Sequence, residues 1–417
     1  MAIFYLPKRF FQASPLLGNT SWMLFAEGAA RGSRLITIIA LASYLSASDY
    51  GIAMLALVCY ELLRVVTRLG AGAAIIQCTD EQLSSTAGNA HLLNWSIGLT
   101  IAVLQYFCAP VLADFYQKPL LEPLLQIMAF SYVIYPIVMV RACLVQRSNN
   151  MKYFALCSAL AVMTDNLSTA LLVYSGFGVY AVAWAKIIAA LVWLGMFLAA
   201  KVPTIKPSYC GKTMVRLLVF SIKVLASDFL KTGRSQIDVL LAGKLLSPEL
   251  FGLYSFAKSA GVGLGQSLSN AYLCCIYPRM ASLQRNQKLA SEFRQMFLIA
   301  LGISSIFIAQ SLMAPIYIPL LFHNDWPNPS ILVAVLCLSA IPCLLVDICA
   351  LKLRVQYQAN KEIALQATSM LSLVLILVIF SPPTPLSFAA CTVAVSFSWL
   401  LLLPIILNLN HKTKLQQ

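Results

Sequence analysis

The chain has 417 residues, of which 60% are hydrophobic and 11% are charged, and its formal net charge is +14. A soluble protein built around one core does not have this composition, so the length cannot be used to count soluble domains. A positive charge on such an apolar chain is typical of loops that face anionic lipid. We therefore expect an integral membrane protein that contacts membrane lipid and no nucleic acid.

Twelve apolar segments are each long enough to cross about 30 Å of hydrocarbon as a helix. The sequence therefore predicts an all-α polytopic membrane protein with about 12 transmembrane helices. The segments lie approximately at 20–46, 50–76, 88–112, 120–143, 153–175, 177–200, 214–243, 250–276, 292–321, 327–350, 361–380 and 386–408.

The basic residues between these segments predict the orientation of the chain. With an even number of spans, nearly all the lysines and arginines of the loops fall on one side, whereas Lys118 and Lys244 fall on the other. Positive residues favour the cytoplasmic side, so we expect both termini in the cytoplasm.

A basic, proline-containing linker at 201–216 separates two sets of six segments. We therefore expect two six-helix lobes, an N-terminal one at 1–205 and a C-terminal one at 206–417. Parallel repeats of this kind typically share a cavity at their interface.

Two short motifs support this internal repeat. The motif DYG at 49–51 corresponds to LFG at 250–252, and VQ at 145–146 recurs at 355–356. The offsets between these pairs are 201 and 210 residues, so the sequence indicates two repeats in the same orientation.

The seventh segment carries a charged face. At 100° per residue, Asp228, Lys231, Arg234 and Asp238 fall within about 120° of arc. Each ionised group facing lipid at mid-membrane depth would cost roughly 2.5–3.5 kcal/mol. These residues must therefore line a water-filled cavity or form ion pairs with neighbouring helices, and both interpretations remain open.

The spans contain nine basic and six acidic residues, an excess of three positive charges. A net-positive cavity suits an anionic ligand, and the forked guanidinium of arginine suits phosphate. These residues are Arg31, Arg34, Arg64, Arg68, Lys186, Lys223, Lys231, Arg234 and Lys258, with Glu27, Glu61, Asp165, Asp228, Asp238 and Asp347.

Two of the acids invite more specific interpretations. Asp165 and Lys186 lie on consecutive segments joined by a short loop, so they could pair, either as a structural bridge or as part of a cavity. Asp347 lies near Lys352 and Arg354 at the end of its segment, which favours a capping ion pair.

Enzyme motifs and metal-ligand patterns are weak in this sequence. GVGLGQ at 261–266 lies inside an apolar segment with no preceding strand, and GKT at 211–213 lacks the first glycine of a phosphate-binding loop. The cysteines lie mostly within the spans, and the three histidines are scattered. We therefore expect no enzyme activity, no metal site and no cofactor, apart from coupling to H⁺ or Na⁺.

Three stretches carry a family resemblance: SDYGIAMLALVCYELLRVVTRLGAGAAIIQ, IDVLLAGKLLSPELFGLYSFAKSAG and YPRMASLQ. They resemble the polysaccharide-transporter family of Wzx-type flippases, and within it the branch of colanic-acid-like exporters. This family belongs to the multidrug/oligosaccharidyl-lipid/polysaccharide (MOP) exporter superfamily.

The resemblance implies a MATE-like, V-shaped pair of lobes that alternates between inward-open and outward-open states. It implies transport of undecaprenyl-diphosphate-linked oligosaccharides across the bacterial inner membrane for exopolysaccharide, O-antigen or capsule biosynthesis. Polysaccharide polymerase and chain-length proteins are implied partners.

The resemblance and the charge pattern together predict the site. The cavity cations that would hold the diphosphate are Arg31, Arg34, Arg64, Arg68, Lys186, Lys231, Arg234 and Lys258. The counter-ion or coupling acids are Glu27, Glu61, Asp165, Asp228 and Asp238.

Two other functions stay open. A cation-coupled drug or ion antiporter of the same superfamily would bind its cargo through the acids, which the excess of basic residues disfavours. A membrane enzyme of glycan assembly would need a sizeable extracytoplasmic loop to hold catalytic groups, and the outer loops are short.

Overall fold

The computed structural model describes residues 28, 32–67, 72–148, 150–285, 287–321, 329–356 and 358–412. The elements formed by these residues are all helices. Three predicted site residues, Glu27, Arg31 and Arg68, lie outside the described residues.

The helices follow one another with short connections. The first covers Gly32–Tyr44. It is followed by α2 (Ala47–Thr67), α3 (Gly72–Gln77), α4 (Asp80–Tyr116), α5 (Leu121–Ala129), α6 (Ser131–Arg147), α7 (Met151–Tyr174), α8 (Tyr180–Ala199), α9 (Gly211–Leu245), α10 (Pro248–Arg285), α11 (Leu289–Leu321), α12 (Ser330–Leu338), α13 (Ala340–Val355), α14 (Ala359–Phe380) and α15 (Pro385–Lys412).

Eight helical stretches of the described chain are long and apolar enough to cross a membrane. They confirm the prediction of an all-α polytopic membrane protein. The total of twelve spans stays a prediction. Two of the eight stretches, Leu121–Arg147 and Ser330–Val355, each consist of two helices in line, α5 with α6 and α12 with α13.

These two composite helices are interrupted at corresponding places. The breaks lie at Phe130 and Ser339, 209 residues apart, which matches the offset of 210 between the repeated VQ motifs. A serine at each break donates a hydrogen bond from its Oγ to a carbonyl three residues back, Ser131 to Met128 and Ser339 to Leu336, both at 2.7 Å. Irregular backbone at membrane depth needs such partners. The matching breaks therefore support the predicted internal repeat.

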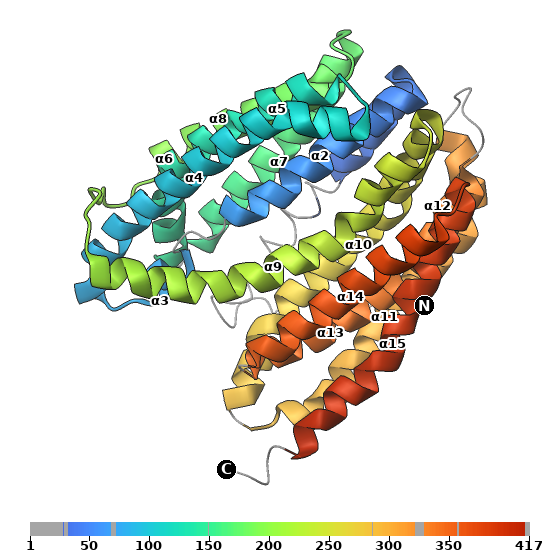
Figure 1. The fold of residues 1–417 in the computed structure, drawn as a ribbon. Helices are drawn as coiled ribbons and strands as arrows, with labels where there is room; N and C mark the ends of the chain where they lie inside the picture. Colours follow the sequence, from blue (N-terminus) through green and yellow to red (C-terminus); the bar gives the residue numbers. More distant parts are fainter. Residues whose placement is uncertain are drawn as a thin grey trace, which may run out of the picture.

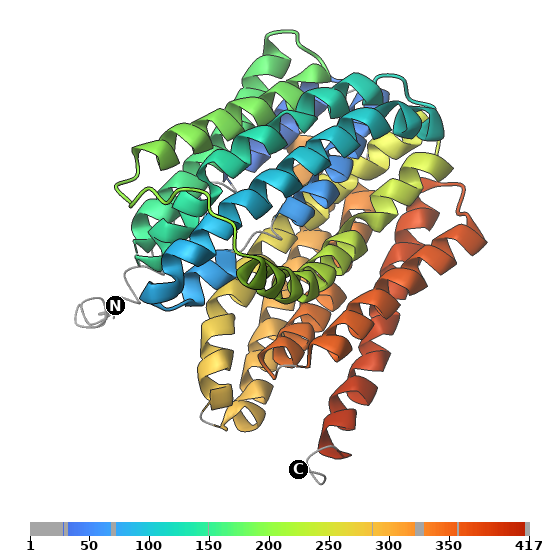
Figure 2. The ribbon, with the colours of Figure 1, turned by 60° about the vertical axis from the view of Figure 1, so that its left-hand side comes forward.

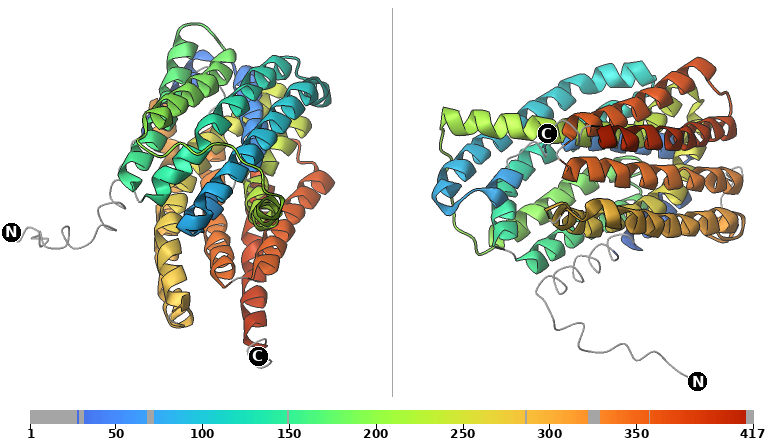
Figure 3. Two further views of the ribbon diagram at one scale, coloured as in Figure 1. Left: turned by 90° about the vertical axis from the view of Figure 1, so that its left-hand side faces the viewer. Right: turned by 90° about the horizontal axis from the view of Figure 1, so that it is seen from below.

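Figure 1 shows two groups of helices that converge towards the end where α2 and α10 begin. We call α2–α8 the first bundle and α10–α15 the second bundle. Helix α9 packs against α2 and α4 of the first bundle and against α14 of the second. Figure 2 and the left panel of Figure 3 show the two bundles inclined to each other, as expected for a V shape. The lobe boundary between 205 and 206 stays a prediction, although residues 201–210 are non-helical.

The repeated motifs DYG and LFG lie against each other at the convergent end. A Cβ atom on Gly252 would lie 1.7 Å from the carbonyl oxygen of Ala47, and a Cβ atom on Gly51 would lie 2.8 Å from the Phe251 ring. No side chain larger than hydrogen fits such a close approach of two helices. We call this contact between α2 and α10 the glycine contact.

Two lysines lie beside the glycine contact, one bridging the two bundles and one joining α9 to the first bundle. Lys118, in the α4–α5 loop, lies 4.2 Å from the centre of the Phe251 ring. Lys244, at the end of α9, donates a hydrogen bond to the Phe115 carbonyl oxygen at 2.5 Å. Lys118 is only 6% exposed, and its ammonium has no hydrogen-bond partner among the described residues. Because burial disfavours the charged amine, the pKa of Lys118 is lowered to about 8.

Candidate functional site

The first charged cluster is built on α2 beside the break between α5 and α6. The rings of Tyr60 and Tyr132 stack with their centres 5.1 Å apart, and Tyr132 donates a hydrogen bond to the Tyr60 carbonyl at 2.8 Å. The Tyr60 hydroxyl lies 3.0 Å from Ser131 Oγ. These buried contacts fix α2 against α6 and so place the next turn of α2, which carries Glu61 and Arg64.

This cluster contains two ion pairs. Arg64 Nη1 lies 3.1 Å from Glu61 Oε1 on the same helix. Lys186 Nζ on α8 lies 2.6 Å from Asp165 Oδ2 on α7, which confirms that this pair forms. Both predicted cations in the cluster are therefore already neutralised by a carboxylate.

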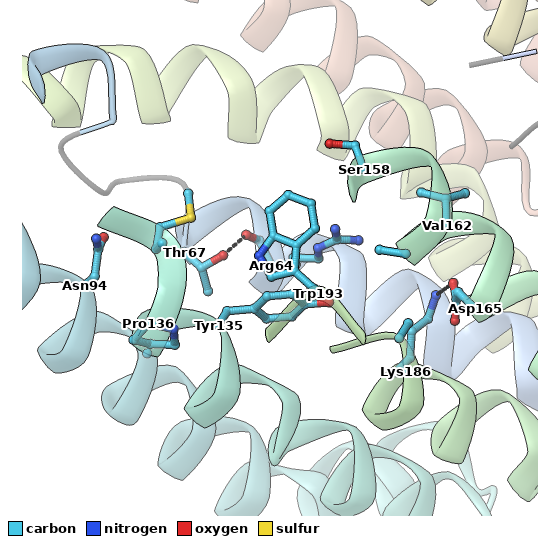
Figure 4. Close-up of a pocket in the computed structure, with 14 residues that line it drawn as sticks. Arg64, Thr67, Asn94, Tyr135, Pro136, Ser158, Val162, Asp165, Lys186 and Trp193 are labelled. Atoms are coloured by element: carbon cyan, nitrogen blue, oxygen red, sulfur yellow. Dashed lines mark hydrogen bonds and ion pairs between the residues drawn. The ribbon is translucent and has the colours of Figure 1, made fainter. Parts of the chain in front are cut away.

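A cavity of about 230 Å³ lies beside this cluster, within the first bundle. Figure 4 shows Asn94 towards one end of it and the Asp165–Lys186 pair towards the other, with Tyr135 and Trp193 between them. The pair is thus a bridge between α7 and α8 that also forms part of a cavity wall, and a functional role of Asp165 and Lys186 stays a prediction. The remaining lining residues are Arg64, Thr67, Gly98, Pro136, Met139, Ser158, Ala161, Val162 and Ala189.

The second charged cluster joins α9 to α13. Arg234 Nη2 lies 2.5 Å from Asp347 Oδ1, and Lys231 Nζ lies 3.3 Å from Asp347 Oδ2. The expectation that Asp347 forms a capping pair is wrong, because its carboxylate lies between two cations of α9 rather than beside Lys352 or Arg354. The sequence could not show this contact, since it joins helices more than a hundred residues apart.

The arrangement around Asp347 has more donors than its carboxylate can satisfy. Arg234 is only 4% exposed, yet its Nε and Nη1 atoms have no hydrogen-bond partner among the described residues. The guanidinium lies 5.3 Å from the Trp399 ring centre, so an aromatic face covers part of it. Lys231 is 36% exposed, which leaves its ammonium accessible from one side.

A third group of charges links α9 to α10. Lys258 Nζ forms an ion pair with Asp238 and also donates to the Ser235 carbonyl at 2.7 Å. The Tyr254 hydroxyl donates to the other Asp238 oxygen at 2.6 Å. Asp238 is 3% exposed and has strong donors on both oxygens, so it is a satisfied interhelical contact in this structure.

A fourth group joins α9 to α13 and α14. Arg354 donates to Asp228 at 2.9 Å and lies 2.7 Å from Glu362, and Ser227 donates to Glu362 at 2.5 Å. Glu362 is 3% exposed. Glu362 was not among the residues predicted from the sequence, although a carboxylate in the first turn of an apolar helix is the signal that could have revealed it.

The four residues predicted to share one charged face therefore pair with two neighbouring helices, α13 and α10. The interpretation of this segment as a source of interhelical ion pairs describes these contacts, and its role in lining a cavity stays a prediction. The cations paired within these four groups are Arg64, Lys186, Lys231, Arg234, Lys258 and Arg354, and their acids are Glu61, Asp165, Asp228, Asp238, Asp347 and Glu362.

These paired groups balance in charge, so they do not themselves supply the predicted positive excess. That excess depends on Arg34 and on groups of which nothing is described, namely Arg31, Arg68 and the Lys223 side chain. Arg34 is exposed, and its Nη2 atom lies 3.5 Å from where a Gly263 Cβ atom would stand, so it is directed to α10 rather than to the first cluster. The roles of all these residues in binding stay predictions. Among the described residues no group of three or more histidine, cysteine or acidic side chains could hold a metal.

The known sequences that are similar to this chain are proteins of polysaccharide biosynthesis. A family model described as "Polysaccharide biosynthesis protein" matches residues 40–332. The chain is 27% identical over 209 residues to the teichuronic acid biosynthesis protein TuaB of Bacillus subtilis, which covers 46% of this chain and 40% of that protein. It is 21% identical over 280 residues to the succinoglycan biosynthesis transport protein ExoT of Rhizobium meliloti, covering 67% of this chain and 56% of that protein. The chain thus spans about half the length of the curated relatives it matches.

Solved structures of similar fold come from the MOP superfamily. An inward-facing multidrug resistance MATE transporter superposes with a TM-score of 0.72 over 92% of this chain and 96% of that one. The lipid II flippase MurJ in an inward closed conformation superposes with a TM-score of 0.67, over 92% of this chain and 87% of that one. Both are 13% identical in sequence, so they show the fold alone, and this fold confirms the MATE-like architecture.

Proposed function

This chain belongs to the family of polysaccharide biosynthesis proteins, and we propose that it is a flippase for undecaprenyl-diphosphate-linked oligosaccharide repeat units. It would move the saccharide head across the bacterial inner membrane by alternating access, while the prenyl tail stays in the lipid. The names of two relatives support a role in surface polysaccharide biosynthesis, since one is a teichuronic acid protein and the other a succinoglycan transport protein. The branch of colanic-acid exporters is part of the proposal.

The observation that carries the proposal is the group of Lys231, Arg234 and Asp347. Two cations share one carboxylate there, and the buried guanidinium retains two nitrogens with no hydrogen-bond partner among the described residues. A diphosphate offers many acceptor oxygens and a charge that matches the surplus cation. We assign the diphosphate to this group, with the accessible Lys231 as the first contact.

Coupling to H⁺ or Na⁺ follows from charge balance within the same proposal. If a diphosphate draws both Lys231 and Arg234 away from Asp347, the carboxylate loses its counter-ions in a low-dielectric site. A proton or a sodium ion would compensate for that loss and leave when the cations return. No enzymatic reaction is part of this function.

The second candidate is a cation-coupled drug or ion antiporter. It is favoured by Asp165 in the wall of the cavity in the first bundle, which could pair with a cationic cargo instead of with Lys186. The two functions differ in the charge of the transported head group.

Reconstitution into liposomes tests the proposal. Purified protein should increase the rate at which a lipid-linked oligosaccharide from the host becomes accessible to an added glycosidase on the opposite leaflet. Cationic dyes trapped in the same liposomes should be retained. Release of dye with no movement of the lipid-linked oligosaccharide would replace the flippase by the antiporter.

Localisation and topology belong to the same proposal. We propose a multi-pass protein of the inner membrane with both termini in the cytoplasm, working beside polysaccharide polymerase and chain-length proteins. A green fluorescent protein fused to the C-terminus should fluoresce, whereas alkaline phosphatase fused there should be inactive. The opposite pair of results would reverse the orientation.

A further inference from the structure

The end at which the two bundles converge is closed by an aromatic side chain. Phe251, at the start of α10, is fully buried. A Cβ atom on Gly51 of α2 would lie 2.8 Å from its ring, and a Cβ atom on Gly243 of α9 would lie 3.3 Å from it. The ring of the second bundle therefore fits against α2 of the first bundle because these two positions carry no side chain. We call the space around the ring, bounded by Gly51, Gly243 and Lys118, the Phe251 socket.

The first bundle contributes a matching aromatic contact. Tyr50 of the DYG motif corresponds to Phe251 of the LFG motif, and each precedes a glycine. Tyr50 is also fully buried, and its ring meets that of Phe256 on α10 edge to face, with the ring centres 5.8 Å apart. Each bundle thus buries an aromatic ring against the other, which favours the closed arrangement of this end.

Lys118 covers the Phe251 socket from the first bundle. The left-handed backbone of Gln117, with φ of 54°, ends α4 just before this lysine, whose Nζ lies 4.2 Å from the centre of the Phe251 ring. An ammonium has three donors, and that of Lys118 has no hydrogen-bond partner among the described residues. One aromatic face replaces only part of the hydration that the ammonium has in water. Burial of Lys118 therefore opposes closure, whereas burial of Phe251 favours it.

In the proposed orientation this end faces away from the cytoplasm, and alternating access requires it to open once in each cycle. We infer that Phe251 and Lys118 form the extracytoplasmic gate, in which the Phe251 ring holds the bundles together and the buried Lys118 ammonium favours their separation. The inference rests on the proposed flippase function and adds the residues that set the balance between the closed and the open gate.

Spin labels at this end test the balance. The labels are placed at the exposed positions Leu120 of the first bundle and Leu386 of the second, and electron paramagnetic resonance in lipid nanodiscs gives the fraction of molecules with separated labels. Phe251→Ala should raise that fraction about tenfold or more, because it removes a buried ring. Adding Lys118→Met to Phe251→Ala should lower the fraction severalfold, because methionine fills the socket and needs no hydration.

Two matched controls accompany these variants. Phe307→Ala removes a buried ring from the middle of α11, away from the Phe251 socket, and should leave the label distance unchanged. Lys244→Met removes an exposed lysine that donates to the Phe115 carbonyl oxygen, and it should not reverse the opening caused by Phe251→Ala. Opposite effects of the two gate residues distinguish a gate from ordinary packing, since a loss of packing alone would open this end in both variants.

A cross-link tests whether the gate must open during transport. Lys118→Cys and Phe251→Cys are combined in a variant whose native cysteines are replaced, and the two thiols are bridged by a short cleavable linker. The bridged protein should not move the lipid-linked oligosaccharide in liposomes, and cleavage of the linker should restore the movement.

The inference is overturned if Phe251→Ala leaves the label distance unchanged or if Lys118→Met separates the labels further. Transport by the bridged protein at the rate of the cleaved protein would also overturn it. Wild-type protein that moves no lipid-linked oligosaccharide, with label distances as expected, would instead overturn the proposed flippase and leave the gate to another transporter of this fold.

Discussion

At the scale of single residues, the charged side chains within the spans differ in how deeply they are buried and in how many partners hold them. Asp238 and Glu362 are almost fully buried and hold several donors each, so they serve as fixed contacts between helices. Lys231 is more than a third exposed, and its partner Asp347 also holds Arg234. Lys231 can therefore leave its carboxylate without leaving that carboxylate unpaired, which suits a residue that must bind and release a ligand.

Replacement of Lys231 tests this role. Lys231→Gln should lower export of surface polysaccharide about tenfold or more, because a hydrogen bond to a charged group contributes roughly 1.5–3 kcal/mol. Lys231→Arg should retain most of the export. Membrane levels of both variants should equal those of the wild type, as measured by immunoblotting. Full export by Lys231→Gln would remove this residue from the diphosphate site.

Replacement of Glu362 tests how much its interhelical contacts contribute to the stability of the fold. Glu362→Ala leaves Arg354 with Asp228 as its remaining acidic partner and leaves Ser227 without its acceptor, and removal of one partner of a buried ion pair costs about 3 kcal/mol or more. We expect a clear fall in the thermal unfolding midpoint of the purified protein in detergent. Glu249→Gln, at an exposed position at the start of α10, is the control and should leave the midpoint unchanged. An unchanged midpoint for Glu362→Ala would show that this network contributes little.

At the scale of helices, the close approach of α2 and α10 holds the bundles together at one end. The glycines that permit it belong to the repeated motifs DYG and LFG, so the repeat places like surfaces against each other. Both helices can approach this closely only because Gly51 and Gly252 have no side chain. Adding a single methyl group at either position should therefore disturb the glycine contact.

Gly252→Ala should open this contact, since its Cβ atom would lie 1.7 Å from the Ala47 carbonyl oxygen. Spin labels at the exposed positions Leu120, before α5 of the first bundle, and Leu386, at the start of α15 of the second bundle, should move apart in electron paramagnetic resonance. Gly195→Ala is the control, because a Cβ atom there meets nothing within 4 Å. The same label distance in all three proteins would mean that the helices adjust around the methyl group.

Lys118 should make the same contact depend on pH. Its pKa is about 8 in the buried position and near 10.5 once the bundles separate into water. The closed arrangement thus binds fewer protons between these values, and it should become more favourable as pH rises from about 8 to 10.5, with no change below pH 8. The Leu120–Leu386 label distance should shorten over that range in the wild type. In Lys118→Met it should not vary with pH; a variant that keeps the dependence would assign it to another group.

The positions of many of the helices, and one contact between them, could be predicted from the sequence. Hydropathy alone placed the apolar segments, because every residue facing lipid must be apolar. Lys186 and Asp165 were also predictable partners, since a short hairpin leaves their helices adjacent. The pairs of Asp347 with Lys231 and of Glu362 with Ser227 were not, because they depend on how α13 and α14 pack against α9.

The cavity residues were harder still to predict. Asn94, Tyr135 and Trp193 stand on three different helices, and in the sequence each looks like an ordinary polar or aromatic residue of an apolar span. Only the packing of α4, α6 and α8 around one space brings them together. The predicted site consists of charged residues, whereas most residues that line the cavity are uncharged and so were not predicted.

At the scale of the whole molecule, the two bundles resemble each other in their composite helices and differ in the charged groups that lie beside these helices. Each contains a composite helix broken at a corresponding place, and each holds a charged group near that helix. Interrupted helices at matching positions of two repeats are typical of transporter binding sites. The cavity of the first bundle is lined by two aromatic rings and a paired acid, whereas α9 and α13 bring two cations to one carboxylate, which is where we propose that the diphosphate binds.

Deletion of the encoding gene in its host, followed by determination of the membrane face on which lipid-linked glycans lie, tests the flippase most directly. We predict that complete undecaprenyl-diphosphate-linked repeat units accumulate on the cytoplasmic face and that surface polysaccharide is lost. Unchanged surface polysaccharide, together with altered sensitivity to cationic compounds, would contradict the flippase and favour the antiporter.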